Sequence, residues 1–211
     1  VVEAERPEDC TRVLVDTELD GDILSAGAAF WRFLESQSGW LKACLDQGPP
    51  TSIEYSDRYV RSPLSVRVLF ELIKRFASTS SDRTELKINT TASPQLQTGH
   101  ALHHDWRDDG TQKAVLQDLF KAYFHVSVKV YARPHELSHS RFLSIRWTNG
   151  FHVEINLDQG VGFYRTKAFK GFDFSLPPES QAQRLAALRF SVENQSASMP
   201  LYILKPSWEH C

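Results

Sequence analysis

The sequence predicts an α/β fold in which helices flank a mixed, mostly parallel sheet. Two observations predict it. Residues 52–131 alternate between short strand-like segments and helical periodicities, and residues 137–157 hold two alternating segments around an Asn-Gly pair. We expect residues 1–50 to form a helical N-terminal extension packed on the main domain, residues 51–211.

The N-terminal extension begins with residues 11–16, where Val13 and Val15 favour a short strand. Apolar residues then recur at helical spacing from residue 23 to residue 34. Ser38-Gly39 breaks this pattern, and residues 40–45 predict another helical turn or two before Gly48-Pro49-Pro50 ends the region.

The main domain opens with a strand, helix, strand unit. Residues 52–55 predict a buried strand, and Ser62 with Pro63 predicts the start of a helix that continues to Phe76. A second strand follows at residues 86–89, which favours parallel pairing because the crossover is long enough. A helix that starts at Asp108-Asp109-Gly110-Thr111 and runs to Tyr123, and a third strand at residues 125–131, extend the pattern.

The hairpin has one register that suits both strands. A two-residue loop would set the apolar face of one strand against the polar face of the other. A three-residue loop, Thr148-Asn149-Gly150, instead pairs Trp147 with Phe151 and Ile145 with Val153, and Gly150 supplies the left-handed residue.

The parity of the first hairpin strand places Arg141, and then His139, on its apolar side. A guanidinium there needs a partner, because removing an unpaired charge from water costs on the order of several kcal/mol. Arg141 either pairs with a structural carboxylate or binds an anion, with His139 beside it. The candidate carboxylates are Glu54, Asp57, Glu154 and Asp158.

The global composition excludes some classes of protein. A formal charge of -2 excludes binding to a polyanion through bulk charge, so an anion site must be local. Three cysteines without paired spacing favour a reducing compartment. The sequence has no apolar run of membrane-spanning length and no signal peptide, so we expect a cytoplasmic protein that is complete or a fragment of a longer chain.

Two further segments carry side chains of the kinds that bind metals, nucleic acids or membranes. The loop after residue 90 holds His100, His103, His104 and Asp105, which are zinc-ligand types in a spacing that matches no strong motif, so we predict no metal site. In residues 163–172, aromatic side chains alternate with cationic ones, among them Arg165 and Lys167. This pattern is typical of segments that contact nucleic acid or an anionic membrane, and also of an ordinary strand or loop with its aromatics packed inward. Residues 181–190 predict a last helix, and residues 200–204 an edge strand.

The motif I-E-Y-S-D-R-Y, followed by helix, strand, helix and strand, and then by L-S-H-S-R-F-L with an N-G turn, resembles phospholipase D-like domains. The nearest likeness is to the C-terminal domain of midbody-associated proteins that carry a microtubule-interacting and trafficking domain. The resemblance covers roughly residues 50–175 and implies a phospholipase D-like fold.

The resemblance also implies roles for single residues. Active members use H-x-K-x4-D, in which His139 would match the nucleophile. Arg141 replaces the Lys, and Arg146 stands where the Asp is expected. Only one such motif is present, so a catalytic form would have to dimerise. These departures favour a site that holds phosphate without cleaving it.

We therefore expect a non-catalytic, phosphate-recognising binding or assembly module without a cofactor, whose partner is nucleic acid or anionic phospholipid. Its ligand residues would be Arg141 and His139, with Asp57 and Arg58 at the strand end and Arg165 and Lys167 nearby. One alternative is a homodimeric phosphodiesterase or nuclease that uses His139 as its catalytic residue. The other is a protein-interaction domain without a ligand site.

Overall fold

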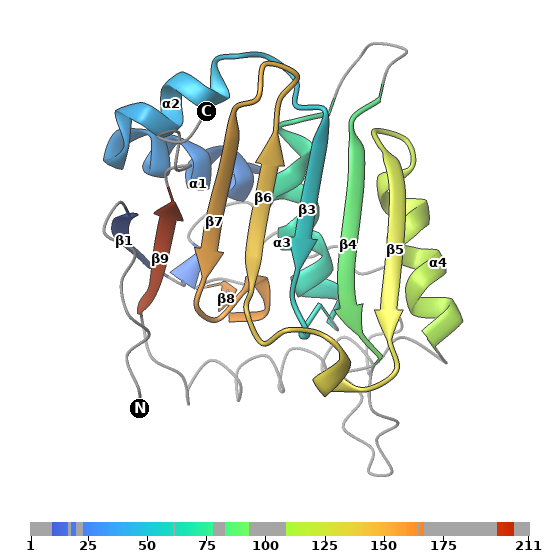
Figure 1. Cartoon of the computed structure of the whole chain (residues 1–211). Helices are drawn as coiled ribbons and strands as arrows, with labels where there is room; N and C mark the ends of the chain where they lie inside the picture. The colour runs from blue at the N-terminus through green and yellow to red at the C-terminus, as the bar shows by residue number, and fades with distance from the viewer. Residues whose placement is uncertain are drawn as a thin grey trace.

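The computed structural model describes residues 10–16, 18–19, 23–60, 62–77, 83–92, 109–163, 165–166 and 198–204. Figure 1 shows a sheet with helices packed along it. The strands are β1 (Cys10–Asp16), β2 (Glu18–Leu19), β3 (Ser52–Ser56), β4 (Glu85–Thr91), β5 (His125–Tyr131), β6 (Phe142–Arg146), β7 (His152–Leu157), β8 (Arg165–Thr166) and β9 (Ser198–Leu204). The helices are α1 (Ile23–Gln37), α2 (Gly39–Leu45), α3 (Pro63–Lys74) and α4 (Asp109–Phe120), with short 3-10 turns η1 (Pro134–Glu136) and η2 (Val161–Phe163).

The main sheet has seven strands in the order β1-β9-β7-β6-β3-β4-β5, and β2 pairs with β8 separately. The predicted α/β class and mixed sheet are confirmed. The prediction of a mostly parallel sheet is wrong, because in this seven-stranded sheet only β3 with β4 and β4 with β5 pair in parallel. The other four pairings are antiparallel, since the hairpin and the strands beyond it add to β3 without crossover helices.

The predicted hairpin register is confirmed. Ile145 pairs with Val153 and Leu143 with Ile155. The Trp147 amide donates to the Phe151 carbonyl at 2.9 Å. Gly150 has a φ of 85°. It is therefore the left-handed residue that the three-residue loop requires, as predicted.

The last strand lies inside the sheet, and its predicted edge position is therefore wrong. β9 pairs with β7 on one side and with β1 on the other. The first fifty residues thus contribute a strand to the main sheet as well as α1 and α2. The boundary at residue 50 stays a prediction, and the predicted helix at residues 181–190 falls outside the described residues.

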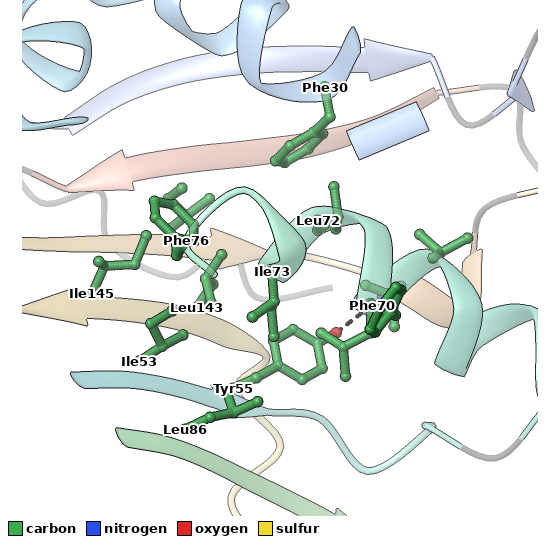
Figure 2. Packing of buried hydrophobic residues seen from close by; sticks show 14 of the residues in the cluster. Phe30, Ile53, Tyr55, Phe70, Leu72, Ile73, Phe76, Leu86, Leu143 and Ile145 are labelled. Atoms are coloured by element: carbon green, nitrogen blue, oxygen red, sulfur yellow. Dashed lines mark hydrogen bonds between the residues drawn. The ribbon is translucent and has the colours of Figure 1, made fainter. Parts of the chain in front are cut away.

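Alternate strand residues form the core with the helices. Ile53, Leu86, Ile145 and Ile155 are fully buried from four adjacent strands. Figure 2 shows these layers meeting around α3, with Tyr55, Ile73 and Phe76 among the packed side chains. The opposite face of β3, β4 and β6 carries mainly polar side chains, so the described helices cover one face of the sheet.

Close contact between α1 and α3 depends on Gly27. A Cβ atom there would lie 2.0 Å from the Glu71 carbonyl oxygen, so only glycine lets the helices approach this closely. Trp31 follows one turn later and donates its indole N–H to the Leu72 carbonyl at 2.8 Å. Within the part of the chain that the structure describes, no helix has the length and apolar character needed to cross a membrane.

Candidate functional site at the carboxyl edge of the sheet

Three loops meet where strands β3 and β7 end and β6 begins, at the lower edge of the sheet in Figure 1. The first is the turn of residues 57–60, the second is the segment 137–141, and the third is residues 158–161. Their contacts run through Asp57 and Arg141, as described below. The carboxyl ends of strands in open α/β sheets are where ligands usually bind, so this edge is the candidate site.

Asp57 is the centre of the contacts, and it is fully buried. One carboxylate oxygen accepts a hydrogen bond from the Tyr55 hydroxyl at 2.8 Å. The other accepts the Tyr59 amide at 2.8 Å. The Tyr55 hydroxyl in turn accepts the Val161 amide at 3.1 Å. The turn after β3 and the loop after β7 are therefore joined through one phenol.

Burial raises the pKa of Asp57, and the hydrogen bonds from the Tyr59 amide and the Tyr55 hydroxyl, with the charge of Arg141, oppose that rise. The raised pKa means that desolvation outweighs these favourable contacts. Ionised Asp57 therefore lowers the stability of the fold, and its hydrogen bonds and the charge of Arg141 reduce that loss.

Arg141 supplies the positive charge beside Asp57. Its Nε lies 3.6 Å from Asp57 Oδ1, and its side chain is only 11% exposed. Its Nη1 donates to the Asp158 carbonyl. The guanidinium carbon also lies 4.9 Å from the centre of the Tyr59 ring. Of the carboxylates that the sequence offered, Arg141 pairs with Asp57, and it contacts the backbone of Asp158.

Arg58 holds the segment that carries His139. Its Nε donates to the carbonyls of Leu137 at 2.9 Å and Ser138 at 3.2 Å. Ser138, His139 and Ser140 are exposed beyond this attachment. The strand parity that predicted an inward His139 ends at Arg141, because residues 137–140 are not a strand. Arg141 faces inward and His139 faces out.

Gly160 allows the third loop to reach the ion pair. Its φ is 68°, and a Cβ atom there would lie 2.1 Å from Asp57 Oδ2 and 2.9 Å from Arg141 Cδ. Both its conformation and its surroundings therefore require glycine. The loop lies directly against the Asp57 carboxylate for this reason.

The structure brings together four of the predicted site residues: Asp57, Arg58, His139 and Arg141 lie on loops that contact one another. Arg165 lies in β8, where its backbone pairs with Glu18. Lys167 falls outside the described residues, as do His100, His103, His104 and Asp105. Among the described residues no three His, Cys, Asp or Glu side chains group as metal ligands.

Sequence reasoning missed Tyr55, Tyr59 and Gly160. Tyr55 shares strand parity with Asp57, which is a signal that its hydroxyl could reach the carboxylate. Tyr59 and Gly160 gave no such signal, because their roles depend on which loops meet. Two further contacts fix the turn of residues 57–60. The Thr91 hydroxyl donates to the Arg58 carbonyl at 2.7 Å, and Gln112 Nε2 donates to the Val60 carbonyl at 3.1 Å.

Comparison with models of known protein families shows which family the chain belongs to. A family described as the C-terminal domain of the DEAD/DEAH box helicase YjiV matches residues 9–205. The chain belongs to this family. No curated protein matches the chain. The YjiV C-terminal domain family thus accounts for nearly the whole sequence, including β1 and β9 at the two ends of the match.

The resemblance to phospholipase D-like domains, and to the domain of the midbody-associated proteins, is therefore wrong. The short motifs that carried it have local explanations in the fold. Arg141 pairs with Asp57, and Gly150 closes the hairpin turn with a positive φ. An Asn-Gly turn is a general feature of β-hairpins and does not mark one family.

Proposed function

We propose that this chain is a non-catalytic module that recognises the phosphates of nucleic acid and serves a DEAD/DEAH box helicase. The family description supplies the helicase. The sequence contains no Gly-Lys dipeptide, so a Walker A phosphate loop is not within these 211 residues. An accessory role in binding suits such a chain better than a motor role.

The observation that carries the proposal is the fixed geometry of the carboxyl edge. Asp57, Arg58 and Arg141 hold three loops in one arrangement, so a ligand there meets a surface that needs little ordering. Exposed cationic or protonatable side chains lie beside these loops: His139 is in the segment 137–141, and Arg133 and His135 are in the connection that follows the carboxyl end of β5. Phosphate contacts of this kind give affinity that falls with salt.

The non-catalytic part of the proposal is supported by the same residues. Arg141 is engaged with Asp57 and with the Asp158 carbonyl, and Asp57 is buried. His139 is exposed, and its ring has no hydrogen-bond partner among the described residues. The dimeric phosphodiesterase is not proposed again, since its basis was the phospholipase D-like resemblance.

The test is fluorescence anisotropy with a labelled oligonucleotide at two salt concentrations. The double variant Arg133→Gln/His139→Gln removes two side chains from the carboxyl edge. Its matched control, Arg146→Gln/His125→Gln, removes the same residue types from exposed positions at the opposite ends of their strands. We expect the edge variant to bind more weakly, with a salt slope reduced by about 1 for each lost phosphate contact.

Equal losses in both double variants would contradict a site at the edge. Absence of oligonucleotide binding by the unsubstituted chain would reject the proposal and favour the second candidate, a protein-interaction domain. The observation that favours that candidate is the internal ion pair, which gives Arg141 a structural partner without any ligand. Such a domain should retain partner binding when the edge cations are replaced.

A further inference from the structure

Strand β5 is the last strand on its side of the main sheet, as Figure 1 shows. It pairs in parallel with β4 over its whole length, from His125 to Tyr131. Within the residues that the structure describes, no strand pairs with its other side, which we call the outer side of β5. The outer side of an edge strand presents backbone N–H and C=O groups with which a further strand can pair.

Backbone hydrogen bonds at the two ends of β5 show which of its residues face β4. The His125 amide donates to the Thr84 carbonyl at 3.1 Å, and the Tyr131 carbonyl accepts from the Ala92 amide at 2.7 Å. Because the backbone groups of successive strand residues point to opposite sides, the residues between these ends alternate as well. Three residues therefore direct their N–H and C=O groups to the outer side: Val126, Val128 and Val130.

The two faces of β5 differ in polarity. Val128 is buried, and Val126 and Val130 are partly buried against the core. The side chains on the open face of the sheet are exposed: His125, Ser127 and Lys129. A strand added to the outer side of β5 would therefore lie beside an apolar row on the helix side and a polar row on the open face.

The sequence around β5 carries charge of one sign. It has no Asp or Glu between Asp118 and Glu136. Lys121, Lys129 and Arg133 lie in this stretch, and all three are exposed. Lys121 is paired with Asp118 at 2.6 Å, so Lys129 and Arg133 supply the cationic charge beside the strand. A segment that pairs with β5 is therefore complementary in charge when it carries carboxylates.

A second copy of β5 fits this side less well. Antiparallel pairing centred on Val128 would place Val126 opposite Val130, but it would bring the two Lys129 side chains to diagonal positions about 7–8 Å apart. β5 contains no acidic residue to separate them. Lysine on an edge strand is a common means of preventing such self-pairing. The charge therefore favours a different chain that carries acidic side chains.

We propose that the outer side of β5 binds an extended acidic segment of a partner protein, which adds to the sheet as a further strand. Apolar and acidic side chains alternate in that segment, the apolar ones beside Val126 and Val130 and an acidic one beside Lys129. In this mode main-chain hydrogen bonds supply affinity and the alternation supplies specificity. β4 separates β5 from β3 and its Asp57 turn, so the inference goes beyond the proposed function and does not depend on nucleic-acid binding.

The first measurement is fluorescence anisotropy of the full chain with a labelled synthetic peptide in which Glu and Val alternate. Its matched control is the same peptide with Lys in place of Glu. We expect the Glu peptide to bind, and the Lys peptide to bind about tenfold more weakly. Failure of the Glu peptide to bind, or equal binding of the two peptides, would overturn the inference.

Charge reversal on the chain tests the same contact from the other side. Lys129→Glu should weaken binding of the Glu peptide about fivefold and strengthen binding of the Lys peptide. Lys87→Glu is the matched control, because Lys87 is exposed on the same face but on β4, one strand farther from the partner, where it pairs with Glu85 at 3.5 Å. Equal effects of the two substitutions would show general attraction between charges and would overturn the inference.

Amide hydrogen exchange tests the backbone pairing without any variant. The amides of Val126, Val128 and Val130 point to the outer side, whereas the His125 amide already donates to the Thr84 carbonyl. We expect the Glu peptide to slow exchange at the three valines and to change it little at His125. A peptide that binds without slowing exchange at the valines would overturn the inference.

Two other occupants would be recognised in the same experiments. A second copy of the chain would slow exchange at the three valines without peptide, and more so as the protein concentration rises. An oligonucleotide that displaces the peptide and loses affinity in Lys129→Glu would assign this lysine to a phosphate contact. Either result would overturn the inference.

Discussion

The two ends of the central strand β3 are joined to their neighbours by different chemistry. At the start of β3, the Trp147 indole donates to the Gly48 carbonyl at 2.9 Å, and Asn149 Nδ2 donates to Gln47 at 3.1 Å. These bonds involve no net charge. At the carboxyl end, a buried carboxylate and a nearly buried guanidinium join three loops.

The contrast shows where the fold tolerates change. A neutral hydrogen bond at a partly exposed turn contributes about 1 kcal/mol, and water can replace it when it is lost. A buried charge that loses its partner has no such replacement. Substitutions at the carboxyl edge should therefore cost far more than equivalent substitutions at the hairpin end, and this difference can be measured.

The largest effect is expected for a pair of glycine substitutions. Gly160→Ala adds a Cβ 2.1 Å from Asp57 Oδ2 at a positive φ, whereas Gly150→Ala meets nothing within 4 Å. We expect the free energy of unfolding to fall by at least about 3 kcal/mol for Gly160→Ala, through overlap and strain together. Gly150→Ala should cost about 1 kcal/mol, through strain alone. Urea denaturation of both variants makes the comparison, and similar losses would remove the distinction between the two ends.

The next effect tests the ion pair itself. Arg141→Ala leaves Asp57 buried without its cation, which should lower the free energy of unfolding by about 3 kcal/mol at neutral pH. Arg146→Ala is the control on the same chain segment, because Arg146 is exposed at the other end of β6, and it should change stability by less than about 0.5 kcal/mol. Chemical denaturation measures both.

The pH dependence of Arg141→Ala sharpens this test. The pKa of Asp57 is raised in the fold, so its contribution to stability is present at low pH and is lost as pH rises through the raised value. Removing Arg141 removes one cause that holds this pKa down. The loss in the variant should therefore shrink as the pH falls and Asp57 becomes protonated. A loss that is constant with pH would show that Arg141 stabilises by packing alone.

A smaller effect is expected at the hairpin end. Trp147→Phe keeps an aromatic side chain in the core and removes the hydrogen bond to the Gly48 carbonyl, at a cost of about 1 kcal/mol. Asn149→Ala removes two exposed bonds, one to Gln47 and one from the Phe151 amide, and should cost less because water can replace both. Thermal unfolding followed by circular dichroism can compare them. A loss for Trp147→Phe as large as that for Arg141→Ala would contradict the contrast.

The smallest expected effect concerns His152, whose contribution to stability is lost as the pH falls, whereas that of Asp57 is lost as the pH rises. Burial, and then the nearby charge of Arg146, lowers the pKa of His152 below 6.5. Its stabilising contribution is therefore complete above pH 6.5 and is lost as pH falls through the lowered value. We expect His152→Gln to flatten the decline in stability on acidification, measured by denaturation at several pH values.

Ser144→Ala serves as the control for His152. The Ser144 hydroxyl lies 2.8 Å from His152 Nε2, so the variant removes the hydrogen bond but keeps the buried imidazole. Because burial is the main cause of the lowered pKa, the pH dependence should remain in Ser144→Ala. If Ser144→Ala and His152→Gln flatten the profile equally, the hydrogen bond and not burial is the cause.

Much of the fold follows from local patterns in the sequence. The three-residue loop at Thr148 to Gly150 and the pairing of Ile145 with Val153 were predictable, because a shift by one residue would expose every apolar side chain of the hairpin. Ser62 and Pro63 likewise predicted the start of α3, where the Ser62 side chain accepts the Ser65 amide.

The positions of β1 and β9 could not be predicted in the same way. β1 and β9 are far apart in the sequence and neither follows its partner strand directly, so nothing local says that β9 enters between β7 and β1. Long-range pairings depend on which edges of the sheet remain open after the other strands have paired. The mistaken edge position for residues 200–204 has this cause.

The sequence by itself determined that an inward guanidinium at Arg141 needs a partner, because strand parity and the cost of burying a charge are local and general. Only the tertiary structure decided that the partner is Asp57, since four carboxylates were equally available along the chain. The same holds for Tyr59 and Gly160. Their roles arise from loops that are about a hundred residues apart in sequence, and chain separation carries no information about distance in the fold.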